Sequence, residues 1–136
     1  GGPRADQAQA RAEAAAALGV AVGQIATSVI FRRVEDDRAV LVVASGDQRV
    51  DEGKVAALVG RIARADADFV KAKSGFSIGG VSPVGHANPP VVLVDRELFR
   101  FSVIWAAAGH PRGVFELSPS QLEGLTGASA SDVAQG

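Results

Sequence analysis

The chain has 136 residues, of which 47% are hydrophobic and 21% charged, and its formal net charge is −1. This length and composition predict one globular domain over residues 1–136 with a core of its own, and they exclude a disordered chain. The absence of cysteine excludes a disulfide framework, a thiolate nucleophile and a cysteine metal site. The near-neutral charge gives no overall basic field for nucleic acid, and no apolar run is long enough to span a membrane.

The first third of the chain predicts a helix followed by two paired strands. "ADQAQARAEAAAALG" is rich in alanine and ends at Gly19, so we expect a helix over 6–18. Two runs rich in β-branched residues, 26–34 and 38–45, are separated by "EDD" and predict an antiparallel hairpin. The second run is nearly all apolar, which is typical of a central strand covered on both faces.

Helix and strand signals alternate through the middle of the chain. We expect a helix that begins at Asp51 as its N-cap, and a second, short helix that ends at Gly75. Three further strands are predicted in "PVVLVD", "FSVIWAAAG" and "GVFEL".

The last predicted helix has clear ends. Ser118 is its N-cap, Pro119 occupies its first position, Gln121 completes a capping box and Gly127 ends it. The order of all these elements predicts a single mixed α+β domain with a largely antiparallel sheet.

A glycine- and proline-rich stretch, "SGFSIGGVSPVGHANPP" at 74–90, interrupts this pattern. It is not a phosphate-binding P-loop, because the lysine and the serine or threonine of that motif do not follow its glycines. Its composition favours a wide turn, and the alternative is a binding site built from backbone N–H donors. Both interpretations stay open at this point.

The two histidines, His86 and His110, are the other candidates for chemistry. His110 follows the strand that carries Trp105 and is interpreted as a partly buried hairpin residue, with general base as the alternative. His86 is expected to be exposed beside Asn88, and Trp105 to lie in the core. Two histidines without a neighbouring carboxylate ligand predict no metal site, and no cofactor is expected.

Several blocks in order resemble the YbaK/ProX family, the free-standing relatives of the editing insertion domain of prolyl-tRNA synthetase. The blocks, between about Ala12 and Val133, are "AAAALGVAVGQIATSVIFR", "GDQRVDEGKVAAL", "GFSIGGVSPVGH" and "VDRELFRFSVIWAAAGHPRGVFELSPSQLEGLTG". The resemblance implies a curved, mostly antiparallel mixed sheet, barrel-like, with helices packed outside. It also implies hydrolysis of the ester between a wrong amino acid and the terminal adenosine of tRNA, by an enzyme acting in trans.

The same resemblance implies where the site lies. A G-x-x-x-P element would line the pocket and contact substrate through its backbone, with a glycine and a histidine bordering it from the facing strand turn. In this chain those residues are Gly79, Gly80, Val81, Ser82, Pro83, Gly109 and His110. Backbone N–H groups suit a developing oxyanion, and a pocket of limited size selects small amino acids.

One residue departs from the family pattern. The strand after the first helix carries in the family a lysine closely tied to activity, and "QIATSVIF" places Thr27 at that position. A hydroxyl can form hydrogen bonds, whereas it lacks the charge of an ammonium group. The lysines of this chain are elsewhere, at Lys54, Lys71 and Lys73. The family also has a segment before the alanine-rich helix, which we expect to be absent here.

Three hypotheses for the function result. The first is a cytoplasmic aminoacyl-tRNA deacylase in which Thr27 and His110 occupy the catalytic positions. Its substrate is the 3′ end of aminoacyl-tRNA, and an aminoacyl-tRNA synthetase is a further partner. No membrane or DNA partner is expected. The second is a module that binds tRNA or an aminoacyl-adenosine and has lost catalysis with the lysine. The third, a nucleotide-binding protein unrelated to tRNA, rests on the glycine stretch alone.

Overall fold

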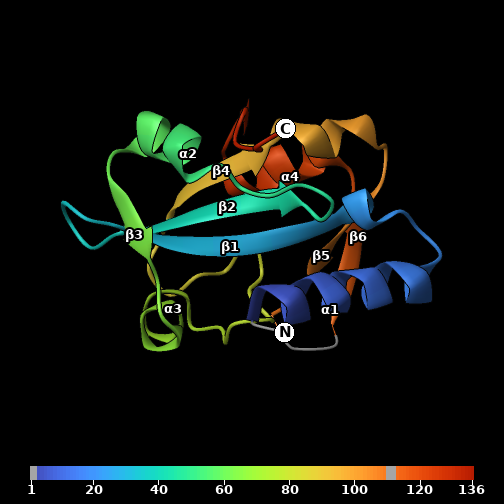
Figure 1. Ribbon diagram of the computed structural model, residues 1–136, viewed down its shortest axis with the longest axis horizontal. Helices are drawn as coiled ribbons and strands as arrows, with labels where there is room; N and C mark the ends of the chain where they lie inside the picture. Colours follow the sequence, from blue (N-terminus) through green and yellow to red (C-terminus); the bar gives the residue numbers. More distant parts are fainter. Residues whose placement is uncertain (1–2, 110–112) are drawn as a thin grey trace.

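The structure is a computed structural model that describes residues 3–109 and 113–136. In these residues the chain forms helices on both sides of one mixed sheet (Figure 1). The elements in chain order are α1 (Pro3–Leu18), η1 (Val22–Gln24), β1 (Ile25–Arg33), β2 (Ala39–Ser45), α2 (Glu52–Val59), β3 (Ile62–Arg64), α3 (Ala67–Ser74), β4 (Val91–Asp95), η2 (Arg96–Arg100), β5 (Ile104–Ala107), β6 (Val114–Leu117), α4 (Pro119–Thr126) and β7 (Ala130–Ser131). None of the helices in the described residues has the length and apolar character needed to cross a membrane.

The sheet has the strand order β6-β5-β1-β2-β4-β7, and β3 pairs with β1 outside this path. The predicted hairpin is confirmed, since β1 and β2 are antiparallel from Ala26 opposite Ser45 to Arg32 opposite Ala39. β5–β6 and β1–β3 are also antiparallel, whereas β1–β5, β2–β4 and β4–β7 are parallel. The sheet is therefore mixed, as expected.

The predicted caps of α2, α3 and α4 are present in the structure, whereas α1 begins at Pro3, three residues before its predicted start. The Asp51 side chain accepts the Lys54 N–H at the start of α2, and Gly75 ends α3 in the left-handed conformation. In α4 the capping box of Ser118 and Gln121 is present in full.

Two strands, β3 and β7, were not predicted from the sequence. They have three and two residues, too few to show an alternating pattern. Each is a strand because it pairs with a longer neighbour, β3 with β1 and β7 with β4.

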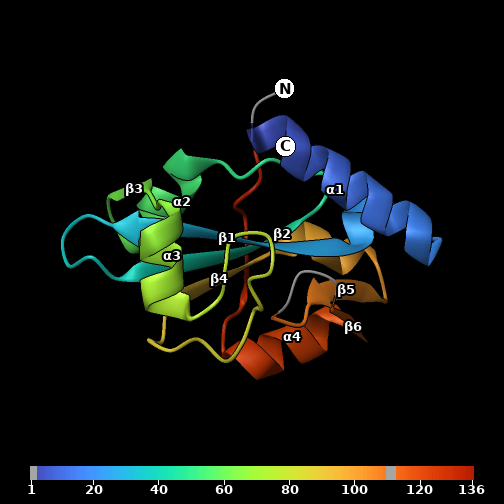
Figure 2. The same ribbon diagram turned by 90° about the horizontal axis from the view of Figure 1, so that it is seen from below.

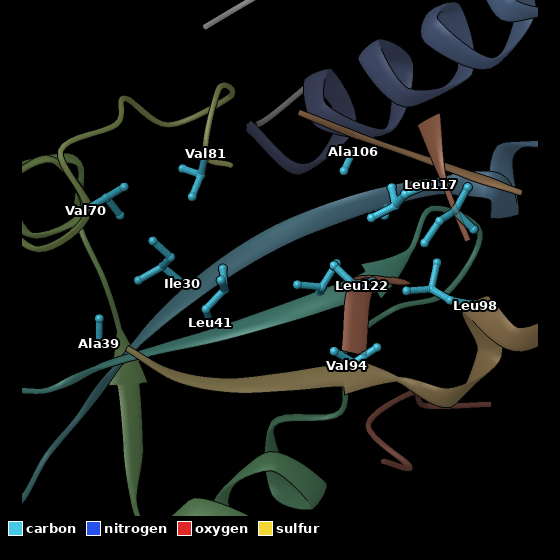
Figure 3. Packing of buried hydrophobic residues seen from close by; sticks show 13 residues of the cluster. Ile30, Ala39, Leu41, Val70, Val81, Val94, Leu98, Ala106, Leu117 and Leu122 are labelled. Atoms are coloured by element: carbon cyan, nitrogen blue, oxygen red, sulfur yellow. The ribbon is translucent and has the colours of Figure 1, made fainter. Parts of the chain in front are cut away.

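The central strand β2 separates two hydrophobic cores. All seven of its residues are buried, as the apolar run predicts. Leu41 and Val43 belong to the first core, which includes residues of α3, α4 and β5, and its packing is shown in Figure 3. Val40 and Val42 belong to the second core, on the other face, which includes Val55 of α2.

A buried carboxylate, Asp95, ties the end of β4 to the end of β2. Its Oδ2 accepts the Ser45 N–H (3.0 Å) and its Oδ1 accepts the Glu97 N–H (2.9 Å). Beside it, the Arg100 guanidinium binds Asp47 Oδ1 (2.7 Å) and Ser45 Oγ (2.8 Å). Asp95 is 1% exposed, and this burial raises the pKa of its carboxyl. The buried charge of this carboxylate therefore destabilises the fold, whereas the two hydrogen bonds that it accepts stabilise the fold.

Asp95→Asn separates these two effects. It removes the buried charge, but its amide nitrogen faces one of the two N–H donors, so we expect the free energy of unfolding at pH 7 to fall by about 1–3 kcal/mol in urea titrations. Because the folded pKa is raised from 3.8, the wild-type carboxyl contributes stability at lower pH that is lost as pH rises through the raised value. The variant should lack this slope. A variant more stable than wild type at pH 7 would show that desolvation outweighs the hydrogen bonds.

Candidate functional site

One edge of β1 is only partly covered by neighbouring strands. On that edge β5 pairs with Ile25 and Ala26, and β3 pairs with the residues from Phe31 to Arg33. Between them, residues 27–30 have no strand partner on that side within the described part of the chain. We call this four-residue stretch the β1 gap.

The backbone of the β1 gap directs hydrogen-bonding groups into the open side. At the end of β1 the Arg33 N–H donates toward β2, to the Arg38 carbonyl (2.8 Å), whereas the Val34 N–H donates to Arg61, on the β3 side (2.9 Å). These directions alternate along a strand. The N–H and C=O of Ser28 therefore face the open side of β1.

Thr27 and Ser28 place hydroxyl groups on opposite faces of the gap. Ser28 lies opposite Val43, so it shares the face of the first core, and Thr27 lies opposite Ala44 on the other face. Both hydroxyl oxygens are buried and have no hydrogen-bond partner among the described residues. The sequence motif singled out Thr27 alone, although the alternation of a strand places the two neighbouring hydroxyls on different faces.

The glycine-rich segment, residues 75–90, forms a loop whose two ends meet at the end of α3. The Ala87 N–H donates to the Ser74 carbonyl (3.0 Å) and the Asn88 N–H to the Lys73 carbonyl (2.9 Å). These bonds satisfy carbonyls that the helix end leaves free. We call residues 75–90 the glycine loop; seen from below the sheet, it runs across the face that α3 and α4 also cover (Figure 2).

The G-x-x-x-P part of the glycine loop turns inward. Gly79 is exposed with φ +92°, a conformation that favours glycine, and residues 80–83 are buried. Val81 packs in the first core with Ile30 of the β1 gap, and Figure 3 shows the two side chains near one another. The Gly80 N–H bonds to the Ser77 carbonyl (3.0 Å).

The N–H groups of Val81 and Ser82 are donors of this turn without a partner among the described residues. Neither forms a hydrogen bond with another described residue, although Val81 is 6% and Ser82 5% exposed. Buried backbone donors are nearly always satisfied, so this pair is unusual. Two successive free N–H groups are what a developing negative charge requires.

Gly109, at the end of β5, meets the glycine loop at Phe76. A Cβ atom on Gly109 would lie 2.8 Å from Phe76 Cε1, and the φ of Gly109 is +93°. The Phe76 ring packs edge-on against the His86 imidazole, with centroids 5.4 Å apart. The structure thus brings Gly109 to the loop. His86 is half-buried, so the expectation that it is exposed was wrong; its ring bonds to the buried part of the loop.

The other sequence candidates have different positions. His110 lies outside the described residues. Trp105 is partly exposed and is not part of either core, and its Nε1 is buried without a partner among the described residues. Trp105 lies opposite Ile25, so it shares a face with Thr27.

The three lysines are engaged elsewhere. The Lys54 ammonium binds Asp132 (3.0 Å), and the Lys71 ammonium binds the Gly75 carbonyl (3.1 Å). The Lys73 ammonium lies over the Phe69 ring, 5.8 Å from its centroid. These contacts bring no ammonium group to the β1 gap. No lysine of this chain therefore takes the place of the family lysine at position 27.

The site is therefore built from neutral donors. No three histidine, aspartate or glutamate side chains of the described residues are grouped as metal ligands. A hollow of about 280 Å³ lies on the outer side of the loop, lined by residues that include Pro83, His86, Pro90 and Leu125. Free N–H groups, two hydroxyls and a nearby hollow are able to bind and polarise a carbonyl compound.

Comparison with known proteins places the chain among aminoacyl-tRNA editing domains. The sequence profile of the aminoacyl-tRNA editing domain matches residues 5–125. YwhH, an uncharacterized protein of Bacillus subtilis (strain 168), is 38% identical over 111 residues, which cover 81% of this chain and 70% of that protein.

Solved structures agree in fold. A protein provisionally described as a trans-editing enzyme for prolyl-tRNA synthetase has a TM-score of 0.87 at 42% identity, covering 93% of this chain and 80% of that one. The hypothetical protein APE2540 has a TM-score of 0.82 at 34% identity, covering 92% and 83%. The expected family and the expected mixed α+β fold are confirmed.

Gly109→Ala tests the contact between β5 and the glycine loop, with Gly79→Ala as its matched control. Both glycines have φ above +90°, but a Cβ on Gly79 meets nothing within 4 Å. Gly79→Ala should therefore cost only backbone strain, about 1–2 kcal/mol. We expect Gly109→Ala to cost about 1–3 kcal/mol more, because Phe76 must move. Equal losses of unfolding free energy would show that Phe76 does not pack against this turn in solution.

Proposed function

Because the chain belongs to the aminoacyl-tRNA editing domain family, we propose that it is a trans-acting deacylase of mischarged tRNA. Its substrate would be the ester between a small amino acid and the terminal adenosine. The observation that carries the proposal is that the N–H groups of Val81 and Ser82, in the buried turn of the glycine loop, have no hydrogen-bond partner among the described residues.

These donors suit the hydrolysis of an ester. Water adds to the acyl carbon, and the carbonyl oxygen becomes an oxyanion that two N–H groups can stabilise. When this intermediate collapses, the bond to the ribose oxygen breaks and that oxygen takes up a proton, which gives free amino acid and uncharged tRNA. Donors of this kind typically contribute a factor of about 10²–10³ each in rate.

The β1 gap is the facing wall of the proposed site. Ser28 contributes a backbone N–H and C=O on the open side, and its hydroxyl lies on the face of Val43, in the same core as Val81. Since Thr27 supplies no charge, the oxyanion would be stabilised by dipoles alone. The proposed enzyme is for this reason slower than one with a cation at that position.

A catalytically impaired binding module is the second candidate function. Thr27 favours it, because it stands at the position of the family lysine, its buried hydroxyl has no partner among the described residues, and the lysines are bound elsewhere. Such a module would hold an aminoacyl-adenosine end, or a synthetase carrying it, without cleaving the ester. The two functions share the site and differ only in turnover.

Deacylation of a panel of mischarged tRNAs separates the two functions. We expect the wild-type chain to release at least one small amino acid above the background rate, and Thr27→Lys, which restores the lysine of the family pattern, to raise kcat about 10–100-fold. Thr27→Val, which has nearly the same shape, is the control for the hydroxyl. An inert wild type together with an active Thr27→Lys would replace the enzyme by the binding module.

Binding is measurable without turnover, because Trp105 is the single tryptophan of the chain. It pairs with Ile25, two residues before Thr27. An adenosine that carries its amino acid through an amide should change the tryptophan fluorescence saturably, and adenosine alone should do so much less. Equal responses to both ligands would support a nucleotide-binding protein instead.

A further inference from the structure

We propose that His86 is a positioning residue, which holds the glycine loop in the conformation that presents the Val81 and Ser82 N–H groups. The proposal rests on the proposed function only for its catalytic consequence. Its structural part concerns two contacts of the imidazole ring and one hydrogen bond to the residue that the ring holds.

The first contact is a hydrogen bond to the buried part of the loop. His86 Nε2 lies 2.6 Å from the Ser82 carbonyl oxygen. A carbonyl only accepts, so Nε2 carries the proton and donates it. Because Pro83 has no N–H, the carbonyl is the only hydrogen-bonding group of the Ser82–Pro83 peptide. His86 therefore holds the one polar group by which this peptide can be fixed.

A second bond supports the same residue. The Val84 N–H donates to Ser82 Oγ (3.2 Å). Both oxygens of Ser82 are thus held by residues that follow it in the chain. The peptide before Ser82 carries one of the two free N–H groups, so its direction depends on how Ser82 is held.

The third contact joins the loop to the end of β5. The imidazole meets the Phe76 ring edge-on, at an interplanar angle of 72°, and Phe76 lies against Gly109. Phe76 is itself fixed by its N–H, which donates to Ser74 Oγ (3.0 Å). One aromatic pair therefore connects the beginning of the loop, its end and the turn after β5.

The second ring nitrogen of His86, Nδ1, indicates that packing alone does not explain a histidine at this position. Nδ1 is buried and has no partner among the described residues. An unsatisfied buried acceptor destabilises the fold, and leucine or phenylalanine would fill the same space without it. We infer that histidine occupies the position for its Nε2–H.

Two substitutions test this assignment. His86→Gln keeps an N–H donor at about the distance of Nε2 and removes the buried Nδ1, whereas His86→Leu keeps the apolar contact with Phe76 and removes the donor. Amide hydrogen exchange reports on the loop through the Gly80 and Val84 N–H groups, which bond to Ser77 and Ser82. The Ala87 N–H, bonded to Ser74, is the internal control for the fold.

We expect His86→Leu to speed exchange at Gly80 and Val84 about tenfold, the factor that corresponds to one lost hydrogen bond, with Ala87 unchanged. His86→Gln should remain within about twofold of wild type. Unchanged exchange in His86→Leu, or equal acceleration in both variants, overturns the proposal whether or not the chain is a deacylase.

Kinetics test the catalytic consequence separately. With a substrate that the wild type hydrolyses, His86→Leu should lower kcat about tenfold with KM nearly unchanged, because the donors act on the transition state. His86→Gln should restore kcat. A rise in KM alone contradicts the positioning role, while absence of turnover in the wild type counts against the proposed function and leaves the exchange result to decide on His86.

Discussion

The edge of β1 that faces away from β2 is longer than the two strands that pair with it. The arrangement of the site depends on this difference in length. β5 pairs at one end and β3 at the other, which leaves residues 27–30 open. An open edge inside a fold has to be covered, because backbone N–H and C=O groups need partners and apolar side chains need neighbours. The glycine loop contributes Val81 to the core beside Ile30. The N–H groups of Val81 and Ser82 in this loop have no partner among the described residues.

The rest of the fold holds the β1 gap and the glycine loop in place. β2 is buried on both faces and fixes β1 from the other side, while Asp95 joins the ends of β2 and β4 through two backbone N–H groups. The loop is held at its ends by α3 and in its middle by His86. Fixed dipoles stabilise charge in a transition state because they need no reorganisation when it forms. In the proposed deacylase such fixed dipoles would take the place of the family lysine.

Local patterns in the sequence predicted much of the fold, and the remainder depends on contacts between distant residues. The apolar run of β2 and the caps at Asp51, Gly75 and Ser118 determine their elements locally. β3 and β7 exist only through pairing with longer strands, so no local pattern shows them. The motif led to the glycine loop and to Gly109. It gave no indication that Ser28 shares the face of the first core or that the His86 ring bonds to Ser82, because both depend on contacts that form only in the folded chain.

The most direct test of the account is a titration of amide NMR signals with an adenosine that carries alanine through a non-hydrolysable amide. The central claim is that the ligand binds between the β1 gap and the glycine loop. We expect the amide signals of Ser28, Val81, Ser82 and Gly109 to shift together with one dissociation constant. Shifts confined to the separate hollow between β6 and α4, lined by residues that include Phe115 and Gly124, with Val81 and Ser82 unmoved, would contradict it.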